Sequence, residues 1–174
     1  MRVIAGQLKG RRLMGPENDD VRPTSDRLRE TLFNVLGPSV KGARVLDAFG
    51  GTAAVAIEAL SRGAVSATVY EKAPKAAKVA QANIDHCGVA DRCTLIRGDF
   101  VRSTGAGAFD LVFVDPPYDM AGLDEALAVA ASHLAADGRL IFEHRRSRQS
   151  PDVIGDRTRV RVLEAGDSAL SFYR

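Results

Sequence analysis

Strand-like and helix-like segments alternate from residue 43 to residue 143, and this alternation constrains the fold more than any other feature of the sequence. Short apolar runs indicate buried strands, and the longer segments between them carry the alanine-rich or amphipathic patterns of helices. The expected strands cover residues 44–47, 66–71, 92–97, 109–114 and 139–143, and the expected helices, one of them before the alternation begins, cover residues 25–36, 52–62, 74–86 and 121–134. Repeated strand–helix units predict the α/β class, with a doubly wound and mostly parallel sheet.

The two ends of the chain depart from this alternation. Residues 159–164 and 168–173 flank a glycine-containing turn and predict a C-terminal antiparallel hairpin, which brings the expected sheet to seven strands. Residues 1–40 are arginine-rich, with short β-like pieces that predict a small hairpin and then a helix that Gly37-Pro38 ends. We therefore expect an N-terminal extension over residues 1–40 and a main domain over residues 41–174.

Composition is that of a single globular domain. A chain of 174 residues with 45% hydrophobic and 26% charged residues can bury a normal core. Its formal net charge of +2 excludes a polybasic tail or a histone-like binder. Cys87 and Cys93 stand alone, which argues against a disulfide framework and a zinc site, so we expect no metal. No apolar stretch approaches the roughly 18 residues of a membrane span, and the N-terminus has no apolar leader, so we expect a cytoplasmic protein that is a monomer by default.

The motif Asp115-Pro116-Pro117-Tyr118 directly follows the expected strand at residues 109–114. The two prolines end the strand because neither can donate to a ladder, which displays a carboxylate, carbonyl groups and an aromatic ring at the strand's carboxyl end. Ligands bind at this edge of open α/β sheets. A carboxylate and a carbonyl can accept the two hydrogens of a planar exocyclic amine while the ring covers the heterocycle. The motif therefore predicts a grip for such an amine, and a plain proline turn is the alternative.

A glycine-rich turn, Asp47-Ala48-Phe49-Gly50-Gly51-Thr52, lies between the first strand of the alternation and its helix. Such a turn lets a ligand approach backbone N–H groups at the start of a helix. It has neither the spacing of a dinucleotide fingerprint nor the lysine of a P-loop, which favours a nucleoside with a charged tail over a pyrophosphate. The candidate ligand-binding residues of this turn are Asp47, Phe49, Gly51 and Thr52.

Acidic residues follow the next strands as well. Glu71 comes about 20 residues after the glycines, where a carboxylate can take both hydroxyl groups of a ribose. Asp99 follows the third strand and can accept a hydrogen bond from an adenine amine, with Phe100 against the ring. Each acid alone is more often a surface or capping group, but acids at the ends of four successive strands predict an S-adenosylmethionine pocket with a target-amine grip beside it. The four are Asp47, Glu71, Asp99 and Asp115.

The same motifs carry a resemblance to a known family. The glycine-rich turn and the Asp115-Pro116-Pro117-Tyr118 motif resemble those of amino-directed S-adenosylmethionine methyltransferases. More narrowly, the segment Arg22-Pro23-Thr24-Ser25-Asp26-Arg27-Leu28-Arg29-Glu30-Thr31-Leu32-Phe33-Asn34 resembles the signature of the RsmD family, and so do Arg2-Val3-Ile4-Ala5-Gly6 and Lys9-Gly10-Arg11-Arg12-Leu13. The resemblance covers essentially the whole chain.

The resemblance implies a Rossmann-like class I methyltransferase that uses S-adenosylmethionine to methylate the exocyclic N2 of a guanine in bacterial small-subunit (16S) ribosomal RNA, within a ribonucleoprotein particle. The catalytic set is then Asp115-Pro116-Pro117-Tyr118. The resemblance also implies that Arg22 or Thr24 reaches the methionine end of the cofactor. Arginines near the start of the chain are candidate contacts to RNA phosphates, with a helix that merely packs on the sheet as the alternative. These arginines are Arg11, Arg12, Arg27 and Arg29.

One departure from the family concerns Ala53 and Ala56, where its members usually have glycine. At Ala56, inside the expected helix, alanine is the better helix former by roughly 0.5–1 kcal/mol. At Ala53, alanine costs stability or affinity only if the backbone needs a positive φ or lies against the cofactor. We expect Ala53 to adopt the right-handed helical conformation at the helix start, where its methyl group is harmless or weakens cofactor binding only mildly.

Two other functions stay open from the sequence. An adenine-N6 methyltransferase of DNA or RNA shares the Asp115 motif, but it usually needs a target-recognition region for which this chain has little room. A non-catalytic RNA-binding assembly module would have lost cofactor binding through Ala53, and the retained acids count against it. Glu143, at the end of the fifth expected strand, has no assigned role.

Overall fold

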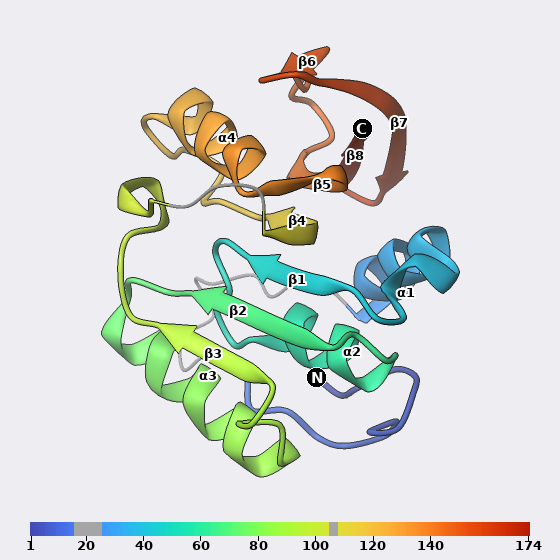
Figure 1. The fold of residues 1–174 in the computed structure, drawn as a ribbon, viewed down its shortest axis with the longest axis vertical. Helices are drawn as coiled ribbons and strands as arrows, with labels where there is room; N and C mark the ends of the chain where they lie inside the picture. The colour runs from blue at the N-terminus through green and yellow to red at the C-terminus, as the bar shows by residue number, and fades with distance from the viewer. Residues whose placement is uncertain (16–25, 105–107) are drawn as a thin grey trace.

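The computed structural model describes residues 1–15, 26–104 and 108–174, and within them one sheet of eight strands carries helices on both faces (Figure 1). The strands are β1 (Arg44–Asp47), β2 (Ser66–Tyr70), β3 (Cys93–Ile96), β4 (Phe109–Val114), β5 (Leu134–Arg145), β6 (Val153–Ile154), β7 (Arg157–Ala165) and β8 (Ser168–Tyr173). The helices are α1 (Asp26–Leu36), α2 (Ala54–Ser61), α3 (Pro74–Cys87) and α4 (Leu123–Ser132), with short 3₁₀ helices η1 (Gly37–Val40) and η2 (Phe100–Arg102).

The strand order is β3-β2-β1-β4-β5-β8-β7-β6. Strands β1 to β5 are parallel, and β8, β7 and β6 continue the sheet in antiparallel pairing. The chain leaves β1 for β2 and β3 on one side and returns to β4 and β5 on the other, so the order reverses between β1 and β4. Open α/β sheets bind ligands at such a reversal, outside the carboxyl ends of the strands. The arrangement confirms the predicted doubly wound α/β class and its C-terminal antiparallel hairpin.

Two details differ from the expectation drawn from the sequence. The described part of the sheet has eight strands rather than seven, because Val153–Ile154 pairs with β7 at the edge. A strand of two residues is too short for a period-two pattern to reveal it. The expected N-terminal hairpin is present in a short form, because Arg2 and Arg12 make an antiparallel bridge and backbone hydrogen bonds join Val3 to Arg11 at 2.9 Å and Leu13 to Met1 at 3.1 Å.

Strand β5 also begins earlier than expected, at Leu134 instead of Arg139. Its pairing with β4 is interrupted by a register shift after Phe109, and the regular register resumes where Leu111 pairs with Arg139. A Cβ atom on Gly138 would lie 2.8 Å from the carbonyl oxygen of Phe109, so this irregular approach of the two strands requires glycine. The sequence pattern of the regular part predicted only the second half of the strand.

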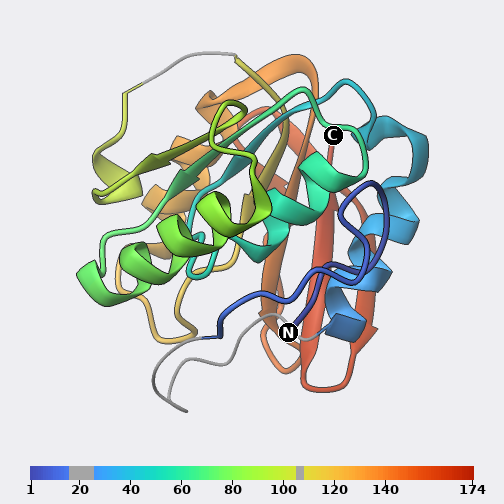
Figure 2. The same ribbon diagram turned by 90° about the horizontal axis from the view of Figure 1, so that it is seen from below.

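Two apolar clusters fill the two faces of the sheet. One lies against α1, α2 and α3, which Figure 2 shows on the same side of the sheet as the N-terminal segment. The other lies against α4. The side chains of β4 alternate between them, with Leu111 and Phe113 in the first cluster and Val112 and Val114 in the second. A strand buried on both faces reads as a continuous apolar run, which is how the sequence revealed β4.

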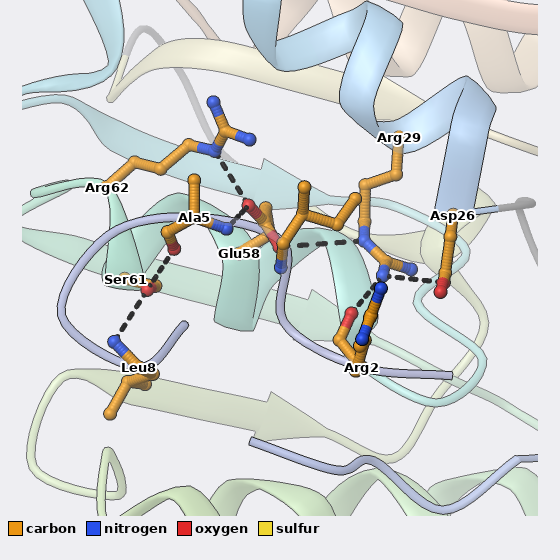
Figure 3. Close-up of polar contacts among 9 residues, drawn as sticks. Arg2, Ala5, Leu8, Asp26, Arg29, Glu58, Ser61 and Arg62 are labelled. Carbon is orange, nitrogen blue, oxygen red and sulfur yellow. Dashed lines mark hydrogen bonds and ion pairs between the residues drawn. The ribbon is translucent and has the colours of Figure 1, made fainter. Parts of the chain in front are cut away.

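Helix α2 is buried along its whole length, although it contains Glu58 and Ser61. The Glu58 carboxylate accepts hydrogen bonds from the backbone N–H groups of Ile4 at 2.7 Å and Ala5 at 3.0 Å, and from Arg62 Nε at 2.7 Å (Figure 3). Ser61 bonds to the same N-terminal segment. Because a buried charge is costly unless it is paired and hydrogen-bonded, these contacts fix the N-terminal segment on α2.

Arg29 joins the same network, and this corrects its predicted role. Its side chain is 0% exposed, lies 3.7 Å from the Glu58 carboxylate, and donates to the carbonyl oxygen of Arg2 and to Asp26 (Figure 3). A guanidinium enclosed in this way cannot reach an RNA phosphate, so Arg29 is removed from the predicted RNA contacts. Its contacts join α1 to α2 across the predicted boundary at residue 40, and the division into two parts stays a prediction.

Candidate active site

A cavity of about 1080 Å³ opens at the carboxyl ends of the parallel strands, where the strand order reverses. Its walls come from the segments that follow β1, β2, β3 and β4, from the ends of β5 and β7 and the start of β8, and from the N-terminal halves of α3 and α4. Arg22 and Thr24 lie outside the described residues. The predicted cofactor and catalytic residues within the described part all line the cavity: Asp47, Phe49, Gly51, Thr52, Glu71, Asp99, Phe100, Asp115, Pro116, Pro117 and Tyr118.

Asp47 ends β1 and is almost fully buried. Burial, and then the nearby carboxylates of Asp115 and Glu71, raise its pKa to about 8. Hydrogen bonds from the backbone N–H groups of Phe49 and Ala56 act in the opposite direction but are weaker. A cationic ligand beside Asp47 would favour its ionised form, because an opposite charge lowers the pKa of a carboxyl group.

Glu71 is held in place by the glycine-rich turn. Its Oε2 accepts a hydrogen bond from the N–H group of Gly51 at 2.9 Å, and its Oε1 accepts one from Ala73 at 2.7 Å. Gly51 has a φ of +52°, and a Cβ atom added to it would meet no atom within 4 Å. A Cβ atom on Gly50, by contrast, would lie 2.1 Å from the Val69 side chain. Gly50 therefore packs closely on β2, whereas the space beside the Cα atom of Gly51 is open.

Ala53 adopts a left-handed conformation, with φ 62° and ψ 21°, directly before α2. This overturns the expectation of a right-handed conformation there, and Ala53 is the one non-glycine residue with a positive φ in the described ranges. The conformation costs an L-residue roughly 1–2 kcal/mol. Ala53 is fully buried and does not line the cavity, so the cost falls on the stability of the turn rather than on contact with a ligand.

Asn83 on α3 supports the same turn and was not predicted. It is fully buried, and its side-chain amide donates to the carbonyl oxygen of Thr52 and to that of Met14, each at 3.0 Å. It also accepts from the N–H group of Met14 at 2.8 Å. The sequence contains one sign of this role, because Asn83 lies three residues after Ala80 and beside Ile84, on the apolar face of the expected helix.

Asp99 and Phe100 form the cavity wall beyond β3. Asp99 accepts a hydrogen bond from the backbone N–H of Val101 at 3.2 Å and lies 3.7 Å from Lys72 Nζ. Phe100 is 2% exposed, and its ring contacts the rings of Phe49 and Tyr70 edge-on. Asp99 is thus fixed by its cap, while Phe100 is mainly a core residue with one side at the cavity.

The Asp115-Pro116-Pro117-Tyr118 motif leaves the sheet at the end of β4 as predicted. Asp115 is half-buried, Pro116 is buried and Pro117 is exposed. The carbonyl oxygen of Pro117 accepts a hydrogen bond from Met120 at 3.0 Å, which closes the turn. All three residues line the cavity, with Pro116 in the protein interior and Pro117 at the exposed rim.

Three side chains that the sequence analysis did not assign hold Tyr118. Its hydroxyl group lies 3.0 Å from Ser168 Oγ, and its carbonyl oxygen accepts from Arg148 at 3.3 Å. The Arg145 guanidinium lies over its ring, 4.7 Å from the centroid. Ser168 begins β8 and pairs with Arg145 at the end of β5, so the antiparallel β5–β8 pair orients an aromatic ring that follows β4.

The cavity has two chemically different ends. Over β1, β2 and β3 it presents the acids that were predicted for the cofactor, around the half-buried glycine-rich turn. Over β4, β5 and β8 it presents the Asp115 motif together with Glu143, Arg145 and Ser168. The charge of Asp115 helps to raise the pKa of Asp47, so the two ends of the cavity meet at these carboxylates.

The three remaining predicted RNA-binding arginines are exposed, and none of the three lines the cavity. Arg11 donates to the carbonyl oxygen of His86 at 3.0 Å, near the C-terminal end of α3. The cavity is lined by Lys75, Ala76 and Val79 in the first half of that helix, and the seven helical residues from Val79 to His86 span about 10 Å. Arg12 and Arg27 are also exposed.

The described residues contain no group of histidine, cysteine, aspartate and glutamate side chains arranged to hold a metal ion. The same residues contain no helix that is long and apolar enough to cross a membrane.

Known proteins resemble this chain over its full length. The family model described as "Conserved hypothetical protein 95" matches residues 1–174. A candidate rRNA methyltransferase of Bacillus subtilis (strain 168), YlbH, is 33% identical over 100% of this chain and 98% of its own length. Ribosomal RNA small subunit methyltransferase D of Escherichia coli (strain K12) is 33% identical over 100% of this chain and 89% of its own. The solved structure of yhhF, a candidate methyltransferase from Escherichia coli, superposes with a TM-score of 0.87 at 32% identity, covering 99% of this chain and 96% of its own.

Proposed function

We propose, from the premise that this chain belongs to the RsmD family, that it transfers a methyl group from S-adenosylmethionine to the exocyclic N2 of a guanine in small-subunit (16S) ribosomal RNA. Family membership makes the chain an rRNA methyltransferase. The observation that carries the finer proposal is the meeting of two acceptor groups, Asp115 and the Pro116 carbonyl, with an acid-lined pocket in one cavity. Such a cavity suits an amine acceptor and a cationic methyl donor.

The residues at the cofactor end fit S-adenosylmethionine. The cofactor carries positive charge on its sulfonium and amino groups, the carboxylates of Glu71 and Asp99 present opposite charge, and a bound cation favours the ionised form of Asp47. Each Glu71 oxygen already accepts one backbone hydrogen bond, and a carboxylate has about four lone-pair sites, so capacity remains for the two ribose hydroxyls. We propose that Asp99 accepts from the adenine amine and that Gly51 gives the ligand access to the backbone. When bound, the cofactor supplies an electrophilic methyl group.

At the target end, the chain's task is to orient a poor nucleophile. The lone pair of guanine N2 is delocalised into the ring, and acceptors on both of its hydrogens draw the nitrogen towards tetrahedral geometry. We assign these acceptors to the Asp115 carboxylate and the Pro116 carbonyl oxygen, with positioning as the main source of acceleration. Asp115 then receives the proton that N2 releases, directly or through water.

The target guanine must leave its base stack, because N2 inside a helix cannot meet the methyl group. Tyr118 is the stacking surface in this proposal, held in orientation by Ser168 and Arg145. Arg11, Arg12 and Arg27 are the proposed phosphate contacts, which makes RNA binding fall as salt concentration rises. Arg22 and Thr24 stay proposed partners of the methionine end of the cofactor.

The test is methyl transfer to small ribosomal subunits isolated from cells that lack this activity, with S-adenosylmethionine as donor and nucleoside analysis of the product. The expected product is N2-methylguanosine, formed at one position. Formation of N6-methyladenosine would instead support the adenine-directed alternative. A calorimetric titration of the protein with S-adenosylhomocysteine accompanies the assay, in the absence and in the presence of small subunits. Absence of binding under both conditions would favour the non-catalytic module. Deproteinised rRNA, assayed in parallel, distinguishes a particle substrate from naked RNA.

A further inference from the structure

A buried acid at the target end of the cavity has no part in the proposed reaction. Glu143 is 5% exposed, lies near the end of β5 and lines the cavity. Val114 of β4 pairs with Phe142 of β5, so the residues that follow them, Asp115 and Glu143, are neighbours on adjacent parallel strands, which lie about 4.8 Å apart. We infer that Glu143 selects guanine by accepting a hydrogen bond from its N1–H group. The inference rests on the proposed function and adds a specificity-determining residue to it.

The alternation of side chains along β5 places Glu143 on the same face of the sheet as Arg145. Ile141 belongs to the apolar cluster against α1 and α2, and Phe142 belongs to the cluster on the other face. Side chains two apart in a strand share a face, so Glu143 and Arg145 lie on the side of Ile141. Arg145 covers the ring of Tyr118. The carboxylate of Glu143 therefore lies on the side of the sheet where the proposed stacking surface is held.

The hydrogen-bonding groups at the edge of the base explain how a carboxylate at the position of Glu143 distinguishes guanine from adenine. Guanine presents two kinds of donor side by side, the N1–H group and the N2 amine. Adenine presents its N6 amine beside N1, which is an acceptor without a hydrogen. A carboxylate only accepts hydrogen bonds, so it pairs with guanine N1–H and repels the N1 lone pair of adenine.

Three acceptors then match three donor hydrogens. Asp115 and the Pro116 carbonyl oxygen hold the two hydrogens of N2, and Glu143 holds the hydrogen of N1. The Asp115 motif alone grips any exocyclic amine, which is why the sequence left guanine and adenine undecided. Glu143 adds the contact that distinguishes them, and a single hydrogen bond to a charged group discriminates about 10- to 150-fold against the base that lacks the donor.

The test uses 2-aminopurine, which keeps the exocyclic amine at C2 but has no hydrogen on N1. Small-subunit particles are reconstituted from rRNA that carries guanine, 2-aminopurine or adenine at the position methylated in the first assay. We expect the wild-type protein to methylate guanine with a kcat/KM about 10-fold or more above that for 2-aminopurine, and to leave adenine unmodified. Comparable rates on guanine and 2-aminopurine with the wild-type protein would overturn the inference without any variant.

The variant Glu143→Gln provides the second readout. Its amide can donate to N1 of 2-aminopurine, so we expect the guanine to 2-aminopurine ratio to fall at least about fivefold, through a slower reaction with guanine and a faster one with 2-aminopurine. Glu125→Gln is the matched control, because Glu125 also lines the cavity but is exposed at the start of α4. The control is expected to keep the wild-type ratio.

Affinity for S-adenosylhomocysteine, measured on each variant, confirms that the pocket has folded. An unchanged base ratio in Glu143→Gln would overturn the inference and leave the proposed function standing. An equal fall of the guanine to 2-aminopurine ratio in Glu125→Gln would also overturn the inference, since the effect would then come from the charge of the cavity alone. Failure of the wild-type protein to methylate guanine particles would overturn the proposed function, and the assigned role of Glu143 with it.

Discussion

The guanidinium group of Arg145 lies over the ring of Tyr118, with its central carbon 4.7 Å from the ring centroid. Arg145 ends β5, whereas Tyr118 follows β4, so the contact bridges two parallel strands at the edge of the cavity. One face of the ring is thereby covered by a cation. A base that stacks on Tyr118 uses the opposite face, with the ring already oriented before the RNA arrives.

The first prediction concerns this cation. Arg145→Ala removes the contact over the ring and is expected to lower kcat/KM about two- to fivefold, because exposed cation–π contacts contribute about 0.5–1 kcal/mol. Arg145→Lys keeps the charge but not the planar group, and should restore only part of the loss. Single-turnover methylation of small subunits measures the effect, with affinity for S-adenosylhomocysteine expected to stay at the wild-type value. A loss of cofactor affinity equal to the loss of kcat/KM would contradict a role confined to the target end.

The second prediction concerns Asp115 as the acceptor of N2–H and of the released proton. Asp115→Asn keeps the shape of the side chain but loses its charge and basicity, and should lower kcat about 10²- to 10⁴-fold. Binding of S-adenosylhomocysteine should be retained, since the proposed cofactor contacts lie over other strands. Asp119→Asn is the control, because Asp119 is an exposed acid that directly follows Tyr118. Loss of cofactor binding in Asp115→Asn would argue against this division of roles.

Local apolar patterns predicted most of the fold. The expected bounds of β1, β4 and β8 match the observed bounds, since each is a short run bordered by clear turn residues. The pattern failed where pairing is irregular, at the bulge that Gly138 permits and at the two-residue strand Val153–Ile154. Such features depend on the neighbouring strand, and a single strand's own sequence does not contain them.

The site shows the same limit. The rule that ligands meet strand ends predicted that residues such as Glu71 and Asp115 lie together, and both line the same cavity. The burial of Arg29 was missed because it depends on Glu58, which lies in another helix. The left-handed Ala53 was missed because alanine rarely adopts that conformation, so the residue type predicted the opposite.

The third prediction concerns pH. The folded protein holds the Asp47 proton up to about pH 8, whereas an unfolded aspartate loses its proton near pH 3.9. Between these values the folded state binds more protons than the unfolded state, so the contribution of Asp47 to stability falls as pH rises. We expect Asp47→Asn to remove this decline in the free energy of unfolding, measured by urea denaturation across that range.

Asp110→Asn is the control for the pH prediction. Arg44 lowers the pKa of Asp110, so its contribution is lost only at acidic pH, as the pH falls through that lowered pKa. The decline between about pH 4 and pH 8 should therefore persist in Asp110→Asn. Parallel pH curves for the wild-type protein and Asp47→Asn would show that the raised pKa of Asp47 does not contribute to stability.

The fourth prediction follows from the conformation of Ala53. Ala53→Gly relieves a left-handed strain of roughly 1–2 kcal/mol but removes a buried methyl group worth about 0.8 kcal/mol, so we expect a net stabilisation between a few tenths and about 1 kcal/mol. Ala56→Gly is the matched control within α2, where glycine should destabilise by at least about 0.5–1 kcal/mol. Thermal and urea unfolding of both variants measure the opposite signs. Affinity for S-adenosylhomocysteine should be unchanged in Ala53→Gly, because Ala53 does not line the cavity. Destabilisation by both substitutions would show that packing around Ala53 outweighs its backbone strain.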